Sequence, residues 1–150
     1  SLKEEGYSFE SIYIDSEDST FDSPSQVNFD LDVLEVGSTF DLDNIYFETN
    51  SFNISSISKK ILNEFIDYLR INNTLVLEIS GYTDSIGNFL ENKVLSEKRA
   101  KSVYDFILKN GILKNRLSYV GYGELYPAVS NSTKKGRAKN RRTEFKVIRK

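Results

Sequence analysis

The stretch from Gly81 to Arg99 reads G-Y-T-D-S-I-G-N-F-L-E-N-K-V-L-S-E-K-R and decides most of what this chain folds into. Thr74–Ser80, directly before it, alternates apolar and polar residues and predicts a strand that a glycine ends. Asp84 then falls at the C-terminal edge of that strand, where α/β sheets place ligand sites. Downstream, the spacing i, i+3, i+7 places three side chains on one face of a helix that begins before the first of them: Asn92, Leu95 and Arg99.

A second stretch, G-R-A-K-N-R-R-T-E from Gly136 to Glu144, adds the basic pair Arg141 and Arg142. A carboxylate at Asp84 accepts hydrogen bonds from an ammonium group, and a guanidinium at Arg99 holds a carboxylate through two parallel donors. Such a pair suits a zwitterion, for example the amino-acid end of a peptide. The alternative is a plain Asp84–Arg99 salt bridge that joins the loop to the helix.

The composition excludes several kinds of chemistry. The chain has 150 residues, 39% apolar and 28% charged, as expected for one soluble domain. It has no Cys, which excludes thiol chemistry, and no His, which is the commonest general base and the commonest metal ligand. We expect a binding protein that is not an enzyme, with no cofactor and no metal. No run matches a membrane-spanning helix. The absence of Met suggests a processed product or a fragment, with any export signal or lipid anchor upstream of Ser1.

Charge is distributed unevenly along the chain. The formal net charge is −2, yet residues 1–50 hold 13 of the 22 acidic residues and one of the 20 basic residues. Residues 1–28 are rich in Ser, Asp and Glu and predict an exposed linker with one short strand at Tyr7–Ile14. The acidic run Asp15–Thr20 has no calcium-loop spacing, which favours a solvated linker over a cation site.

Hydrophobic periodicity predicts alternating strands and helices. One or two strands are expected within Val33–Phe47, with a turn at Gly37-Ser38. One helix is expected from Ser55 or Ser56 to Asn72. A second helix is expected from Ser96, or from as early as Asn88, to Lys109. The other predicted elements are strands at Thr74–Ser80, Arg116–Tyr122 and Thr143–Ile148 and a short basic helix at Thr133–Asn140. This order predicts an α/β two-layer sandwich, βαβαβ-β, with a mixed sheet and helices on one face.

Five stretches occur in a fixed order: Ile45–Ser51, G-Y-T-D at Gly81–Asp84, N-K-V-L-S-E-K-R-A at Asn92–Ala100, Arg116–Ser118 followed by Gly121–Glu124 and Pro127, and G-R-A-K-N-R-R at Gly136–Arg142. Together they resemble the OmpA-like C-terminal domain, the peptidoglycan-binding module shared with the Pal lipoproteins. The resemblance runs from about Phe40 to Lys150. It divides the chain into an acidic N-terminal flank, residues 1–39, and an OmpA-like domain, residues 40–150.

The resemblance implies that the domain grips the diaminopimelate of the peptidoglycan stem peptide. The family's principal acid and base correspond to Asp84 and Arg99. Its supporting ligand-binding positions correspond to Asn50, Thr83, Asn92, Leu95 and Arg141. Tyr82 stands where the family usually has His, so a pH response tied to that His would be absent. Glu48 stands where Asp is common, a mild change.

The implied role is to anchor the outer membrane or an envelope complex to the cell wall without a covalent bond. The expected location is the periplasm, in association with the outer membrane through a larger parent protein. The upstream part of that parent is where other envelope proteins would bind. The resemblance does not distinguish a lipoprotein, a porin or a component of a secretion or motility machine.

Two other functions have weaker support in the sequence. A wall-degrading glycosidase uses a pair of carboxylates, but Asp84 has no acidic partner in its motif. Nucleic-acid binding would use the basic run of Lys134, Lys135, Arg137, Lys139, Arg141 and Arg142, but no nucleic-acid motif accompanies it. We expect a peptide ligand bearing a D-amino-acid zwitterion and not the glycan strand, because Trp is absent and the sequence shows no evident row of aromatic residues to stack sugars.

Arg141 has two interpretations. Alternation counted back from Phe145 and Val147, the predicted buried side of the last strand, places Arg141 on their side and Arg142 on the other. A charged Arg141 would then lie beyond the edge of the core and turn toward the ligand. The alternative is that Arg141 caps the C-terminus of the helix at residues 133–140.

Overall fold

The computed structural model describes residues 10–13, 27–30, 35–42, 45–47 and 51–150. Two short strands near the N-terminus, β1 (Glu10–Tyr13) and β2 (Val27–Asp30), pair antiparallel in a sheet of their own. β1 lies within the strand predicted at Tyr7–Ile14. β2 was not predicted, because the strands expected in this region lie within residues 33–47.

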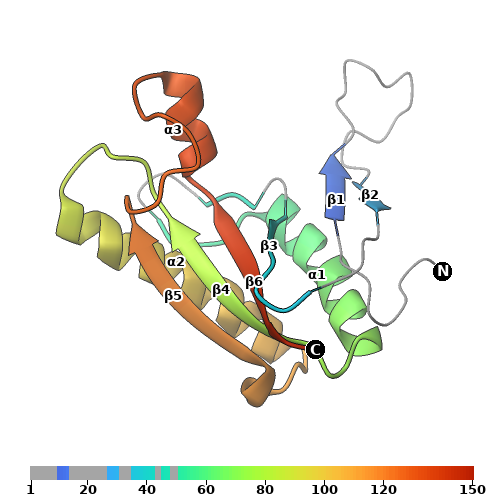
Figure 1. Ribbon diagram of the computed structural model, residues 1–150. Helices are drawn as coiled ribbons and strands as arrows, with labels where there is room; N and C mark the ends of the chain where they lie inside the picture. Colours follow the sequence, from blue (N-terminus) through green and yellow to red (C-terminus); the bar gives the residue numbers. More distant parts are fainter. Residues whose placement is uncertain (1–9, 14–26, 31–34, 43–44, 48–50) are drawn as a thin grey trace, which may run out of the picture.

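The main body is a mixed four-stranded sheet with the strand order β3-β6-β4-β5. β4 and β5 run parallel, whereas β6 is antiparallel to both of its neighbours. α1 and α2 cover one face of the sheet, and α3 lies at one end of it (Figure 1). The elements are β3 (Thr39–Asp41), α1 (Ser56–Ile71), β4 (Val76–Tyr82), α2 (Phe89–Lys109), a 3-10 turn (Lys114–Arg116), β5 (Leu117–Gly123), α3 (Lys134–Asn140) and β6 (Thr143–Arg149). The predicted fold class is confirmed.

Side-chain caps fix where the helices begin. The Ser55 hydroxyl accepts a hydrogen bond from the Ser58 N–H at the start of α1. The Asn88 side chain accepts two N–H groups at the start of α2, and the Thr133 hydroxyl accepts the Gly136 N–H at the start of α3. These residue types satisfy the unpaired N–H groups of a first helical turn. α2 therefore takes the longer of its two predicted forms and brings Asn92 and Arg99 onto one helix.

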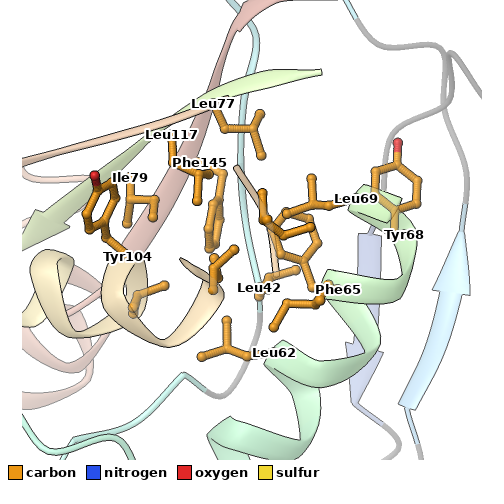
Figure 2. Packing of buried hydrophobic residues seen from close by; sticks show 14 of the residues in the cluster. Leu42, Leu62, Phe65, Tyr68, Leu69, Leu77, Ile79, Tyr104, Leu117 and Phe145 are labelled. Atoms are coloured by element: carbon orange, nitrogen blue, oxygen red, sulfur yellow. The ribbon is translucent and has the colours of Figure 1, made fainter. Parts of the chain in front are cut away.

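The hydrophobic core lies between the sheet and the two long helices (Figure 2). Phe65 of α1 packs against Phe145 of β6 with ring centroids 4.8 Å apart, and both side chains are fully buried. Leu77 and Ile79 of β4 point to the same side and are also fully buried. Because side chains alternate along a strand, the residues between them face away from the helices.

The α2 helix lies directly against the backbone of β4 and β5. A Cβ atom added at Gly81 would overlap the Ser96 carbonyl, and one added at Gly121 would overlap the Glu97 backbone. At Gly123, the backbone N–H donates to the Ser96 hydroxyl over 2.8 Å. The glycines of the G-Y-T-D and G-Y-G motifs are thus needed for helix–sheet contact, and that contact sets the height of Arg99 above the sheet.

A buried arginine joins the end of α1 to the start of β5. Arg116 is 9% exposed and donates to the carbonyl oxygens of Leu69, Asn72 and Leu75 over 2.6–3.0 Å. These carbonyls lie at the C-terminus of α1 and just beyond it, where helix carbonyls lack intrahelical partners. Burial lowers the pKa of the Arg116 guanidinium, which nevertheless stays charged at neutral pH.

Backbone pairing with β6 begins before β3. The Gly37 N–H donates to the Val147 carbonyl, and the Val147 N–H donates to the Ser38 carbonyl. Gly37 has φ of 89°, and the turn lies at Val36-Gly37, one residue before the predicted Gly37-Ser38. The sequence-based boundary between residues 39 and 40 falls inside β3 and stays a prediction.

Replacement of Gly121 by Ala should lower the free energy of unfolding by about 1–3 kcal/mol, because the new methyl group forces α2 away from the sheet. Urea unfolding followed by circular dichroism measures this. Ser118→Ala, on the exposed face of the same strand, should change the stability by under about 0.5 kcal/mol. Equal stability of the two variants would show that α2 does not need this close approach.

Deletion of residues 1–28 should leave the thermal unfolding midpoint of the remaining chain almost unchanged. The two-stranded sheet shares no strand pairing with the four-stranded sheet among the described residues. Differential scanning calorimetry of the two chains tests this. A large fall in the midpoint would show that β1 is an integral part of the domain.

Candidate functional site

A hollow of about 480 Å³ opens where β4 ends, beside the first half of α2. We call it the Asp84 hollow. The residues before β6 and the segment Ile45–Phe47 complete its walls. Its lining residues are Ile45, Tyr46, Phe47, Gly81, Tyr82, Thr83, Asp84, Ile86, Asn92, Leu95, Arg99, Ala138, Arg141, Arg142 and Thr143. Asp84 is the one carboxylate among these described residues.

Both carboxylate oxygens of Asp84 are engaged. Oδ1 accepts the Ile86 N–H over 3.0 Å, and Oδ2 accepts from Arg141 Nη1 over 2.7 Å. The Asp84 side chain is 13% exposed, and that of Arg141 is 47% exposed. The loop is held by Asn92, whose amide donates to the Ile86 carbonyl over 2.9 Å. Asp84 is thus fixed in place at the edge of the hollow.

Arg99 reaches the same hollow from α2. Its Nε donates to the Ser51 carbonyl over 2.9 Å, and its guanidinium carbon lies 5.1 Å from the centre of the Phe47 ring. Burial lowers the pKa of the Arg99 guanidinium, the positive charge of Arg141 lowers it further, and Asp84 partly offsets both. No ion pair within the described part of the chain involves Arg99. A desolvated cation beside another cation is a strong site for an anion.

The alternative of a plain Asp84–Arg99 salt bridge is not found, because Asp84 pairs with Arg141 instead. Arg141 comes before β6 rather than within it, so strand alternation does not apply to it. Its backbone N–H donates to the Arg137 carbonyl at the C-cap of α3, but its guanidinium points to Asp84. Arg141 is thus the C-cap of α3 through its backbone, as one of its two interpretations predicts, while its side chain pairs with Asp84.

The Asp84 hollow gathers most of the residues singled out from the sequence. Six of them line it, and Asn50 lies outside the described residues, as does Glu48. Thr83 is 6% exposed, and its N–H donates to the Gly123 carbonyl, so it ties the loop to β5. Leu95 supplies apolar wall. The six are Thr83, Asp84, Asn92, Leu95, Arg99 and Arg141; their role in ligand binding stays a prediction.

Comparison with known proteins identifies the family. A profile described as the OmpA family matches residues 46–141, which is more than half of the chain. The chain belongs to the OmpA family.

Two curated relatives and one solved structure show the extent of the similarity. Outer membrane porin F of Pseudomonas fluorescens is 37% identical over 76% of this chain and 33% of the porin. The peptidoglycan-binding protein ArfA of Mycobacterium bovis is 37% identical over 69% of this chain and 32% of ArfA. A putative MotB-like protein from Desulfovibrio vulgaris superimposes with a TM-score of 0.67 at 27% identity, over 75% of this chain and 73% of that chain. The matched part of the chain thus spans about a third of the length of these two curated relatives.

Arg142 lines the hollow of this OmpA-family domain, although it is not among the ligand-binding residues predicted from the sequence. Its guanidinium lies 3.8 Å from the centre of the Tyr82 ring and forms an ion pair of 3.2 Å with Glu144. Its Nη2 donates to the Tyr126 carbonyl over 3.1 Å. Tyr82, the residue in place of the family's His, is therefore the base of a cation–π contact.

The same contact begins a row of aromatic rings. Tyr82 stacks on Tyr122 with centroids 5.3 Å apart, and Tyr122 meets Tyr126 edge to face at 5.5 Å. We call these three residues the tyrosine row. Burial raises the pKa of Tyr82 and Tyr122, with Glu144 adding to the effect at Tyr82 and Glu78 at Tyr122, so both phenols stay protonated at neutral pH. This row is not evident in the sequence and is formed only by the folded sheet and the loop after it.

A second, more open hollow of about 900 Å³ adjoins the first. We call it the Tyr126 hollow. The two share Ile45, Tyr46, Ala138, Arg141, Arg142 and Thr143 as lining residues. The two hollows therefore lie side by side at these residues.

The described part of the OmpA-family domain holds no cluster of three or more potential acidic, His or Cys metal ligands. Within the same residues, no helix has both the length and the apolar character to cross a membrane.

Arg141→Ala should cost under about 1 kcal/mol of folding stability, because the pair with Asp84 is half-exposed on the arginine side. Arg116→Ala should cost about 2–4 kcal/mol, because three buried carbonyls lose their donor. Chemical unfolding of the two variants under one set of conditions compares them. A larger loss at Arg141 would make it a structural residue instead of a ligand residue.

Proposed function

We propose that this domain binds the peptidoglycan stem peptide through the zwitterionic end of diaminopimelate, without a covalent bond and without catalysis. The observation that carries the proposal is Arg99, a half-buried cation that forms no ion pair with the described residues, in one hollow with Asp84. A free amino-acid end offers a carboxylate to Arg99, which has no carboxylate partner among the described residues, and an ammonium group that can donate to Asp84. The similarity to ArfA, a peptidoglycan-binding protein, supports this ligand class.

Each predicted residue has a distinct part in this arrangement. The ligand carboxylate binds the outer nitrogens of Arg99, whose Nε is already used by Ser51. The ammonium approaches Asp84 Oδ2 beside Arg141. Leu95 contacts the aliphatic part of the ligand, whereas Asn92 and Thr83 act through the loop that they hold. Asn50 is proposed from family resemblance alone.

In the cell, the domain would anchor its parent protein, or the outer membrane, to the wall from the periplasm. The residues preceding the domain, placed at 1–39, would connect it to the remainder of that parent and to other envelope proteins. Relatives that are about three times as long as the matched region, one of them an outer membrane porin, support this arrangement.

The two competing functions find less support. A glycosidase needs two carboxylates at the reacting bond, and Asp84 is the one carboxylate among the described lining residues of its hollow. For nucleic-acid binding, half of the basic run is committed within the protein. Arg137 donates to the Asn131 carbonyl, Arg141 pairs with Asp84, and Arg142 pairs with Glu144. Few free cations then remain to contact phosphates.

Arg99→Ala should weaken binding of a diaminopimelate-containing stem tripeptide by about 2–5 kcal/mol, because the ligand carboxylate loses its partner in a partly desolvated site. Isothermal titration calorimetry measures this. The same tripeptide with Lys in place of diaminopimelate keeps the ammonium but lacks the distal carboxylate. The wild-type chain should discriminate strongly between the two peptides, and Arg99→Ala should bind both with nearly equal affinity.

Arg70→Ala removes an exposed arginine of α1 that pairs with Asp67 and does not line the hollow, so it serves as the matched control. It should retain wild-type discrimination. Equal wild-type affinity for the two peptides, or binding of peptide-free glycan as tight as that of the tripeptide, would refute the proposal.

A further inference from the structure

The tyrosine row lies on the face of the sheet that the helices leave open. Gly81 and Gly121 face α2, as the overlap with its backbone shows. Because side chains alternate along β4 and β5, the next residues, Tyr82 and Tyr122, point to the opposite face. Their rings pack on each other and not in the core, and Tyr126 extends the row with 67% of its surface exposed.

Tyr126 is held in a strained conformation. It has φ of 57°, the only positive φ at a non-glycine residue in the described part of the chain, and it precedes Pro127. L residues other than Asn and Asp seldom adopt this region. Arg142 stabilises it by donating to the Tyr126 carbonyl. Because the exposed ring of Tyr126 contributes nothing to the core, this backbone strain indicates that the ring has a functional role.

The loop that carries Tyr126 is fixed from the far side by Asn140. The Asn140 Oδ1 accepts the Ala128 and Val129 N–H groups over 2.9 and 3.1 Å, and its amide donates to the Val129 carbonyl over 2.8 Å. Asn140 is fully buried. The two residues that follow it are Arg141, which holds Asp84, and Arg142, which holds Tyr126. One short segment thus sets the position of Tyr126 relative to the Asp84 hollow.

We propose that Tyr126 and the adjoining Tyr126 hollow form a saccharide subsite, which takes a sugar ring of the glycan to which the bound stem peptide is attached. The proposal rests on the proposed function of the Asp84 hollow. An exposed phenol ring offers an apolar face to the C–H face of a pyranose and a hydroxyl to its polar groups. Arg141 and Arg142 line both hollows, so a peptide held at Asp84 leads its attached sugar toward Tyr126.

The saccharide subsite is preorganised, so its contribution to binding affinity should be measurable. Since Arg142 and Asn140 already fix the loop, little ordering is required when a sugar binds. One stacked ring should then add about three- to tenfold in affinity, the range expected for an aromatic contact of this kind. The peptide supplies the larger share of the affinity, and a glycan without peptide binds only weakly.

The test compares two ligands on one chain by calorimetry. One is the free diaminopimelate-containing tripeptide, and the other is the same tripeptide attached to its N-acetylglucosamine–N-acetylmuramic acid disaccharide. The wild-type chain should bind the disaccharide-linked form about three- to tenfold more tightly. Tyr126→Gly, which also relieves the positive φ, should abolish this preference and leave the affinity for the free tripeptide unchanged.

Tyr126→Asn, which tolerates the left-handed conformation, repeats the test without the flexibility of glycine. Phe89→Ala removes an aromatic residue of α2 that is 44% exposed and lines neither hollow, and it should keep the preference. Equal wild-type affinity for the two ligands, or a preference that survives both Tyr126 substitutions, overturns the saccharide subsite and assigns the row to another partner. Failure of both ligands to bind would instead refute the proposed function of the Asp84 hollow.

Discussion

The close approach of α2 to the sheet is the constraint on which the site depends. Gly81 and Gly121 allow the helix backbone to lie directly on β4 and β5, and the Ser96 hydroxyl accepts the Gly123 N–H across that contact. Arg99 begins the next helical turn after Ser96. The distance of Arg99 from the sheet is therefore set by contact between the backbones of α2 and the strands, which cannot adjust as flexible side chains can. Tyr122 directly follows Gly121, and Asp84 lies three residues after Gly81, just beyond the end of β4, so core packing and site geometry share one origin.

Three arginines and one aspartate line the Asp84 hollow, and the arginines have different roles because their partners differ. Arg142 is tied to Glu144, Tyr82 and the Tyr126 carbonyl, which makes it a structural link between the two hollows. Arg141 pairs with Asp84 but is half-exposed. Among the charged residues that line the hollow, Arg99 is the one without an ion-pair partner in the described part of the chain, and it is partly buried. An incoming anion therefore gains the most binding free energy at Arg99.

Sequence alone predicted the helices and most of the strands, because caps at Ser55, Asn88 and Thr133 and regular apolar spacing are local signals. Local motifs also placed Asp84 and Arg99 near each other. The tyrosine row was missed because Tyr82 and Tyr122 are far apart in the chain and meet only when β4 and β5 pair in parallel. The repeated Gly-Tyr motif was the available signal, since a glycine that faces a helix turns the next side chain to the open face.

The Asp84–Arg141 pair explains why the Asp84 hollow would favour a zwitterion over either charge alone. Asp84, Arg99 and Arg141 leave one positive charge in excess, so an amine without a carboxylate raises the local positive charge and must approach Asp84 beside Arg141. A carboxylate without an amine gains Arg99 but meets Asp84 as a like charge. A ligand with both groups places each opposite its complement and leaves the excess charge unchanged. Selectivity then follows from the penalties against the incomplete ligands as much as from contacts with the complete one.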